Sequence, residues 1–280
     1  MMNRIFLIVA AILFALSASA GAASIPIPNA GFELRETFDP FAESIDKYNK
    51  WQLEYWRHFE VDNNGGPIRI WNPGVPGVDE TPQGVLDVAF GGNAPEGKYV
   101  ALVRSRYNDD EMPEIRPIRD FEAAAQILDA TFDPSLTYIL TAKVGRLPYG
   151  PAEGGSVNYT PDWHGYILQL AVGGTNVGGS TYQGRVEGGT VIAEVGGGAE
   201  VPKNDFITAT LEYTPDPAND YLAGQPLQIR LGALECNKYM HATTGWVVFD
   251  DVKLTAIPEP ATIGLLALGG LALVRRRRNG

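Results

Sequence analysis

Seven stretches of this chain alternate between apolar and polar residues, and each is 5 to 10 residues long and bounded by turn-forming residues. They are rich in β-branched and aromatic side chains, which favour strands. One further stretch, 121–128, has the composition of a short helix. Seven or more strands in a body of about 230 residues predict an all-β fold, a single jelly-roll β-sandwich. The predicted strands are 98–104, 136–145, 165–172, 190–195, 206–213, 227–231 and 246–254.

Paired glycines lie between several of these predicted strands, at 173–174, 178–179, 188–189 and 196–197. Hairpin turns need residues with positive φ, so the pairs predict turns. The lysine that completes a phosphate-binding loop does not accompany them, which argues against a nucleotide site.

The N-terminus has the layout of a secretory signal peptide. Arg4 precedes an unbroken apolar run from Ile5 to Leu16, and small residues follow it at 18–22. This run is shorter than the roughly 20 residues that span a bilayer, so we expect cleavage by signal peptidase near Gly21 to Ser24. Residues 1–23 are therefore predicted to be the signal peptide, followed by a β-sandwich domain at 24–256.

The C-terminus carries a second apolar segment with its own flanking residues. Residues 261–274 have no charge, the triplet Pro258-Glu259-Pro260 precedes them, and Arg275, Arg276, Arg277 and Arg278 follow. Such a segment predicts a short transmembrane helix, whose arginines stay on the cytoplasmic side.

The order of these parts at 257–280 resembles the PEP-CTERM sorting signal of Gram-negative bacteria. The resemblance implies an exosortase as a partner that recognises the triplet. It further implies an exported protein that is transiently tethered to the inner membrane and then delivered to the cell surface or extracellular matrix.

The body between the two terminal segments is acidic. Five of the 22 basic residues and one of the 33 acidic ones lie in those segments, which leaves 17 basic and 32 acidic residues and a net charge of about −15. This charge argues against nucleic-acid binding. The single cysteine, Cys236, cannot form an internal disulfide and is expected to be a small buried residue.

Four short stretches of the body resemble the galactose-binding-like jelly rolls, in particular the carbohydrate-binding modules. They are Asn29-Ala-Gly-Phe-Glu33, Gly97-Lys-Tyr-Val, the stretch from Gln126 to Val144, and Phe249-Asp-Asp-Val-Lys-Leu254. The resemblance implies the same sandwich and weak binding of an extracellular polysaccharide.

Glycan binding would need exposed aromatic side chains on which sugar rings stack. Aromatic residues also fill the cores of sandwiches, so each candidate has core packing as its alternative. The candidate ligand-binding residues are Trp51, Trp56, Trp71, Tyr107 and Trp163.

Catalytic motifs are missing from the sequence. His58, His164 and His241 are isolated, and neither a zinc-protease motif nor a nucleophile elbow occurs. The acidic stretch 108–114 contains carboxylates of the kind that a polysaccharide hydrolase uses, although a solvated loop also explains it. We therefore expect a protein without enzymatic activity; the alternatives are a structural matrix protein without a ligand, or a hydrolase.

The last predicted strand contains adjacent carboxylates. Asp250 shares its parity with Trp246, Val248, Val252 and Leu254, which predicts that it points toward the core. The resemblance to the jelly rolls implies a structural calcium ion held by Glu33 with Asp250 or Asp251, since calcium prefers oxygen ligands. The alternative is that Asp250 accepts backbone N–H groups and no metal is present.

Overall fold

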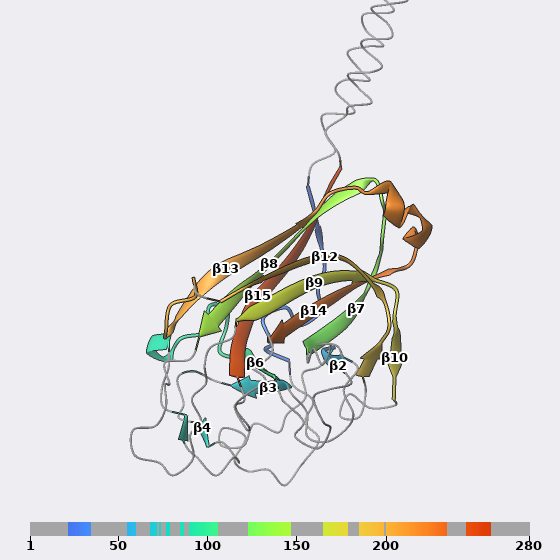
Figure 1. Ribbon diagram of the computed structural model, residues 1–280. Helices are drawn as coiled ribbons and strands as arrows, with labels where there is room; N and C mark the ends of the chain where they lie inside the picture. Colours follow the sequence, from blue (N-terminus) through green and yellow to red (C-terminus); the bar gives the residue numbers. More distant parts are fainter. Residues whose placement is uncertain are drawn as a thin grey trace, which may run out of the picture.

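The structure, a computed structural model, describes residues 22–34, 55–59, 68–71, 73, 77–78, 85–86, 90–105, 123–146, 165–178, 185–198, 200–233 and 245–258. Within these ranges it contains 15 β-strands and two short 3-10 helices. The strands form two large sheets and one two-stranded ribbon (Figure 1). The predicted all-β sandwich is confirmed.

The first large sheet has six strands in the order β13-β8-β15-β6-β3, and β1 pairs with β15 beside this path. All of its pairs are antiparallel. Its strands are β1 (Ala23–Ile25), β3 (Ile68–Trp71), β6 (Val100–Ser105), β8 (Leu136–Arg146), β13 (Asp205–Tyr213) and β15 (Gly245–Pro258).

The second large sheet has seven strands in the order β10-β11-β2-β7-β14-β9-β12. Its pairs are antiparallel except for β11 with β2, which is parallel. Its strands are β2 (Arg57–Phe59), β7 (Ala123–Thr131), β9 (Tyr166–Val172), β10 (Thr175–Val177), β11 (Arg185–Glu187), β12 (Thr190–Gly197) and β14 (Pro226–Ala233).

The remaining elements are small. Strands β4 (Gly77–Val78) and β5 (Val85–Leu86) pair with each other. The 3-10 helix η1 (Phe90–Gly92) precedes β6, and η2 (Pro217–Leu222) connects β13 to β14. Asp216 caps η2, because its side chain accepts a hydrogen bond from the backbone N–H of Ala218 at 2.9 Å.

The main hydrophobic core lies between the two large sheets. Alternate residues of each strand point into it, as the period of a strand requires. From the first sheet they include Tyr138, Leu140 and Phe249, and from the second Leu168 and Ile229. These side chains are almost completely excluded from solvent.

All seven predicted strands are confirmed, and each agrees with an observed strand within a few residues. The predicted helix at 121–128 is wrong, because residues 123–131 form β7. Its alanines favour a helix in isolation, yet small side chains are also what this strand needs. Ala124 lies in the main core, whereas Ala123 and Ala125 are fully buried on the opposite side beside Phe59.

Two of the four glycine pairs lie at turns, and of the third pair only Gly178 is described. Gly173 and Gly174 connect β9 to β10, Gly188 and Gly189 connect β11 to β12, and all four have positive φ. Gly178 follows β10 and has positive φ as well. The prediction is wrong for 196–197, which lies inside β12.

Strand β15 contains a bulge at the two predicted calcium ligands. The register shifts between Asp250 and Lys253, and Asp251 adopts a φ of 46°. Because the extra residue changes the parity, Val247 and Phe249 face the main core before the bulge, whereas Val252 and Leu254 face it after the bulge. The prediction that Asp250 points toward the main core is therefore wrong: it shares a face with Val248, which packs in a smaller cluster with Phe90.

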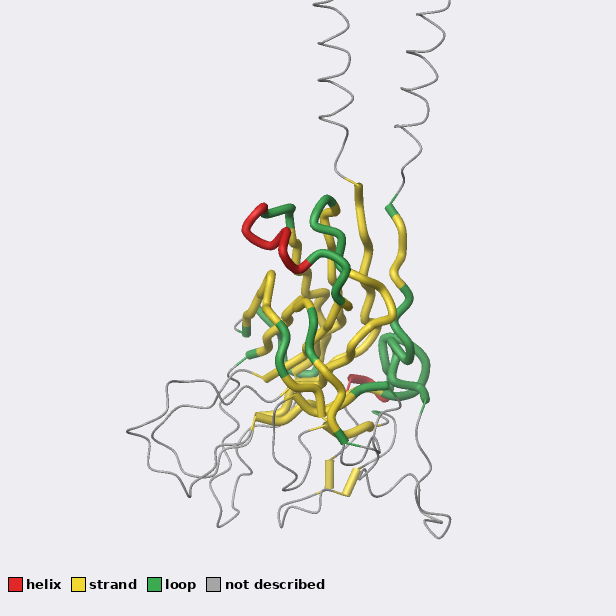
Figure 2. Tube along the Cα trace, turned by 90° about the vertical axis from the view of Figure 1, so that its right-hand side faces the viewer, coloured by secondary structure: helices red, strands yellow, loops and turns green. Residues whose placement is uncertain are grey.

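The two ends of the described body lie side by side. Ala23 of β1 pairs with Ala256 of β15, and Ile25 pairs with Leu254. Figure 1 shows the blue first strand and the red last strand leaving the sandwich at the same end, and in Figure 2 the 3-10 helix η2 lies at this end too. The segments that precede Ala23 and follow Pro258 are thus attached to neighbouring strands.

Candidate functional site

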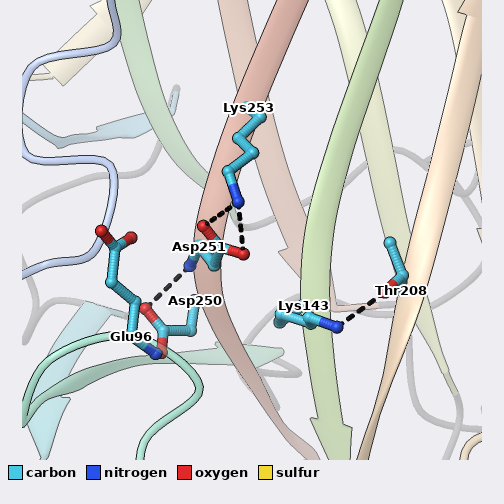
Figure 3. A network of polar contacts seen from close by, with 6 residues as sticks. All are labelled: Glu96, Lys143, Thr208, Asp250, Asp251 and Lys253. Atoms are coloured by element: carbon cyan, nitrogen blue, oxygen red, sulfur yellow. Dashed lines mark hydrogen bonds and ion pairs between the residues drawn. The ribbon is translucent and has the colours of Figure 1, made fainter.

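The first polar site lies at the β15 bulge, on the side of the six-stranded sheet that faces away from the main core (Figure 3). Asp250 is completely buried. Its Oδ2 accepts a hydrogen bond from the backbone N–H of Glu96 at 2.8 Å, and its Oδ1 accepts one from Asp251 at 2.7 Å. Lys143 is the residue opposite Asp250 on β8, but its ammonium group donates to Thr208 at 2.9 Å.

Two further carboxylates approach this bulge from other segments. Glu33 Oε1 accepts the backbone N–H groups of Lys98 and Tyr99, at 2.7 and 2.8 Å, and so fastens the N-terminal segment to the start of β6. The carboxyl group of Glu96 lies near that of Asp251. The ammonium group of Lys253 forms an ion pair with Asp251, with its Nζ 2.7 Å from Oδ1 and 2.8 Å from Oδ2.

Burial and charge change the proton affinity of these groups. Burial raises the pKa of Asp250 to about 7, against the opposing effect of the two backbone N–H donors. Burial also raises the pKa of Glu96, and repulsion from Asp251 adds to the rise. The hydrogen bond with Asp251 raises the pKa of Lys253.

The predicted calcium ligands thus lie near one another, but most of their carboxylate oxygens already accept hydrogen bonds from N–H groups. Asp250 uses both oxygens, Glu33 uses Oε1, and Asp251 pairs with an ammonium group. In the described part of the chain, no three His, Cys, Asp or Glu residues are arranged to hold a metal. Calcium stays a prediction here, and the residue that the sequence analysis missed at this site is Glu96.

The predicted aromatic ligand residues do not assemble into a described platform. Trp51, Tyr107 and Trp163 lie outside the described residues, and Trp71 is in β3 with its side chain outside them. Trp56 is buried, packs against Phe32 with ring centroids 5.3 Å apart, and donates from Nε1 to the carbonyl of Asn29 at 3.0 Å. Trp56 is therefore a core residue, and the prediction that it stacks on a ligand is corrected.

A second polar site lies on the seven-stranded sheet, on the face that points away from the main core. We call this the outer face. In the register of the strands, one row of residues crosses five neighbouring strands, β2, β7, β14, β9 and β12. The row consists of Arg57, Ala125, Arg230, Gln169 and Glu194.

Arg230 is the centre of this row and is 4% exposed. Its guanidinium carbon lies 3.8 Å from the centroid of the Phe59 ring, a cation–π contact. Its Nε donates to Gln228 at 2.6 Å, its Nη1 to Gln169 at 3.3 Å, and its Nη2 to the carbonyls of Gly188 and Gly189, at 2.8 and 3.2 Å. Gln169 in turn donates to Glu194 at 2.6 Å.

Two glycine turns approach this network so closely that a side chain would not fit. A Cβ at Gly174 would lie 2.8 Å from Gln228 Nε2, and one at Gly189 would lie 2.9 Å from Gln228 Oε1 and 3.0 Å from Arg230 Nη2. These glycines therefore serve close packing as well as positive φ.

Among the described residues, two donors of the outer face lack a hydrogen-bond partner although their atoms are buried. They are Nη1 of Arg57 and Nε2 of Gln228. Such groups are rare in folded proteins, because each costs about 1–3 kcal/mol. The sequence carries one sign of this site: the predicted strand 227–231 has a glutamine and an arginine, Gln228 and Arg230, on the same face, and the sequence analysis used them only as evidence of alternation.

Most of the sorting signal lies outside the described residues. Pro258 is the last residue of β15, whereas Glu259, Pro260, the apolar segment 261–274 and the arginines at 275–278 are not described. The same holds for the acidic stretch 108–114 and for Cys236. No helix in the described ranges is long and apolar enough to cross a bilayer.

Comparison with known proteins gives two family matches. The PEP-CTERM protein-sorting motif matches residues 256–278. This confirms the resemblance at the C-terminus and marks the chain as an exported protein that is sorted to the cell surface through an exosortase. The HpiC1 cyclase family, described as HpiC1-like, matches residues 23–255.

Solved structures of cyclases resemble the body. A Stig cyclase from Fischerella sp. TAU in complex with (3Z)-3-(1-methyl-2-pyrrolidinylidene)-3H-indole is 26% identical, with a TM-score of 0.52, over 85% of this chain and 98% of that one. A cyclase from the same source in complex with 4-(1H-indol-3-yl)butan-2-one is 25% identical, with a TM-score of 0.51, over 84% and 98%. A comparison with curated proteins finds no match. The body of this chain, which the sequence analysis had not connected with cyclases, belongs to the HpiC1 cyclase-like family.

Proposed function

We propose that this exported protein is a non-catalytic binding sandwich, and that its ligand contacts the outer face of the seven-stranded sheet. The ligand class that we favour is a polysaccharide of the cell surface or matrix. Sugar hydroxyl groups both donate and accept hydrogen bonds. The outer face carries guanidinium groups, which donate, and amide groups, which do both.

The observation that carries this proposal is the position of Arg57 and Arg230 on either side of Ala125. Neighbouring strands lie about 4.8 Å apart, so the two arginine backbones are separated by about 10 Å. Ala125 between them is covered by Phe59, and Arg230 is almost completely buried, so the half-buried Arg57 is the arginine that a ligand can reach. Arg57 Nη1 is buried and without a partner in the structure. A ligand oxygen that accepted this N–H would remove the cost of leaving it unpaired.

We favour binding over catalysis because of the chemistry of the row. Amides and guanidinium groups hold hydrogen bonds but do not exchange protons near neutral pH, as a general acid or base must. The carboxylate at the end of the row, Glu194, accepts a hydrogen bond from Gln169. The described residues of the row therefore suit recognition.

A glycan array with the body of the protein, residues 23–258, which includes all of the described strands, tests this proposal. We expect binding to at least one surface polysaccharide, with salt dependence that reflects the arginines. A blank array would argue for the alternative, a structural protein without a glycan ligand.

A second candidate function is the cyclisation of an indole-containing substrate. The membership of the chain in the HpiC1 cyclase-like family and the indole compound in a relative's structure favour it. Titration of the same body, residues 23–258, with 4-(1H-indol-3-yl)butan-2-one separates the two candidates. Binding of this ketone together with a blank glycan array would favour the second candidate.

A further inference from the structure

The sorting motif begins inside the folded body. The motif matches from Ala256 onward, and Ala256, Ile257 and Pro258 are the last three residues of β15. Each of them pairs with a residue of β8, and the last pair joins Pro258 to Leu136. The first proline of the triplet is therefore part of the sheet.

Strand β1 covers the other edge of β15 next to the motif. Its three residues pair with Leu254, Thr255 and Ala256, and Ile25 packs against the main core. Three contacts hold the residues that follow β1: the carbonyls of Pro28, Asn29 and Ala30 accept hydrogen bonds at 3.0 to 3.2 Å. Their donors are Gln126 Nε2, Trp56 Nε1 and the backbone N–H of Val252.

A processing enzyme that acts at the triplet has to gain access to an extended stretch of chain around it. Sites that recognise extended peptides commonly do so through main-chain hydrogen bonds. The main-chain groups at 254–258 are engaged with β8, and at 254–256 with β1 as well. Ile257 and Pro258 must therefore separate from β8 before such a site can receive them.

We propose that β1 restrains the exosortase-mediated processing of this chain, because it holds the strand that leads into the triplet. Processing then proceeds through local opening of the β1–β15–β8 end, not through unfolding of the whole sandwich. The N-terminal strand of the mature protein sets how often this end opens. The inference depends on strand pairing and the sorting motif, and it is independent of the ligand proposed above.

The test follows the loss of an epitope tag placed after Gly280 of the full chain in a bacterium that has the processing enzyme. Ile25→Asp should undock β1, because it places a charge against the core. If the end of β15 opens more easily by the equivalent of about one net hydrogen bond, its open form becomes about tenfold more populated. The tag should then be lost about tenfold faster than in the wild type. The matched control is Val177→Asp in β10, also a three-residue strand whose last residue is half-buried, and it should leave the rate unchanged.

An insertion variant distinguishes restraint of the motif by β1 from general destabilisation of the sandwich. Insertion of Gly-Ser-Gly-Ser between Thr255 and Ala256 moves the motif off the sheet. This chain should be processed rapidly, with no further acceleration by Ile25→Asp. If Ile25→Asp prevents folding, Ile25→Ala provides the milder undocking. Equal or slower tag loss in the β1 variants, or equal acceleration with and without the spacer, would overturn the proposal.

Discussion

The guanidinium carbon of Arg230 lies 3.8 Å from the centroid of the Phe59 ring, and this contact joins strands β14 and β2 across β7. A charged group on the solvent side of a sheet is ordinary, but this one is almost completely buried. Gln228, Gln169 and two glycine carbonyls accept its hydrogen bonds. Arg230 thus fixes the Gly188–Gly189 turn onto the outer face.

Replacement of Arg230 should therefore destabilise the sandwich. In Arg230→Met the cation–π contact is lost and the acceptors around the guanidinium group are left unpaired. We expect a loss of about 3 kcal/mol in the free energy of unfolding. Denaturant titration measures it, with Lys203→Met at an exposed position as the control. A loss below about 1 kcal/mol would show that the network contributes little.

The two glycines of the β11–β12 turn offer a matched pair. Both have positive φ, but a Cβ at Gly188 meets no atom within 4 Å, whereas one at Gly189 meets Gln228 and Arg230. Gly188→Ala should cost about 1 kcal/mol from the backbone alone. Gly189→Ala should cost about 1–2 kcal/mol more, because the side chains beneath it have to move. Equal thermal shifts for the two variants would contradict the close packing.

Asp250 predicts a particular pH dependence of stability. Its pKa is raised to about 7 in the folded protein, from 3.8 in the unfolded chain, so the folded state binds more protons between these values. Its contribution is complete below about pH 3.8 and is lost as the pH rises through 7. In chelator, the unfolding free energy of the wild type should therefore fall relative to Asp250→Asn between pH 4 and 7.5. The difference is a few kcal/mol at most, at about 1.4 kcal/mol per pKa unit; parallel curves would contradict the raised pKa.

The calcium ion that the sequence predicts at this bulge can be tested through the melting temperature of the protein. An ion that binds only the folded state raises its melting temperature by mass action. Chelation should lower the melting temperature, and added calcium should restore it much better than magnesium does. Glu96→Gln should weaken this response. A melting temperature that does not change in chelator, with no metal found by elemental analysis, would leave Asp250 as an acceptor for the backbone of Glu96 and Asp251 alone.

The sequence predicts most of the fold because its strands carry their own signal. Alternation located the strands that contribute Leu140, Leu168 and Ile229 to the core. It failed at residues 123–131, where burial between two layers selects small alanines that also favour helices. It failed again at the face of Asp250, because a single bulged residue reverses the parity and nothing in the local pattern marks it.

The outer-face site was harder to predict for a different reason. Arg57 and Arg230 are brought into one row by the register of three strands that are distant in sequence. Periodicity assigns a residue to a face of its own strand, but it does not give the order of the strands. Trp56 shows the reverse case, a residue that was predicted at a ligand site but lies in the core. The sequence does not separate the two roles, because a side chain suited to stacking on a sugar is equally suited to core packing.

The central claim is that a ligand binds at Arg57 on the outer face, and calorimetric titration of Arg57→Ala tests it most directly. The titrant is the oligosaccharide that binds best on the array, and the control is Lys143→Ala on the other sheet. The account predicts binding at least tenfold weaker for Arg57→Ala, from the loss of a buried donor to the ligand, and unchanged binding for Lys143→Ala. Wild-type affinity in a folded Arg57→Ala protein would contradict it.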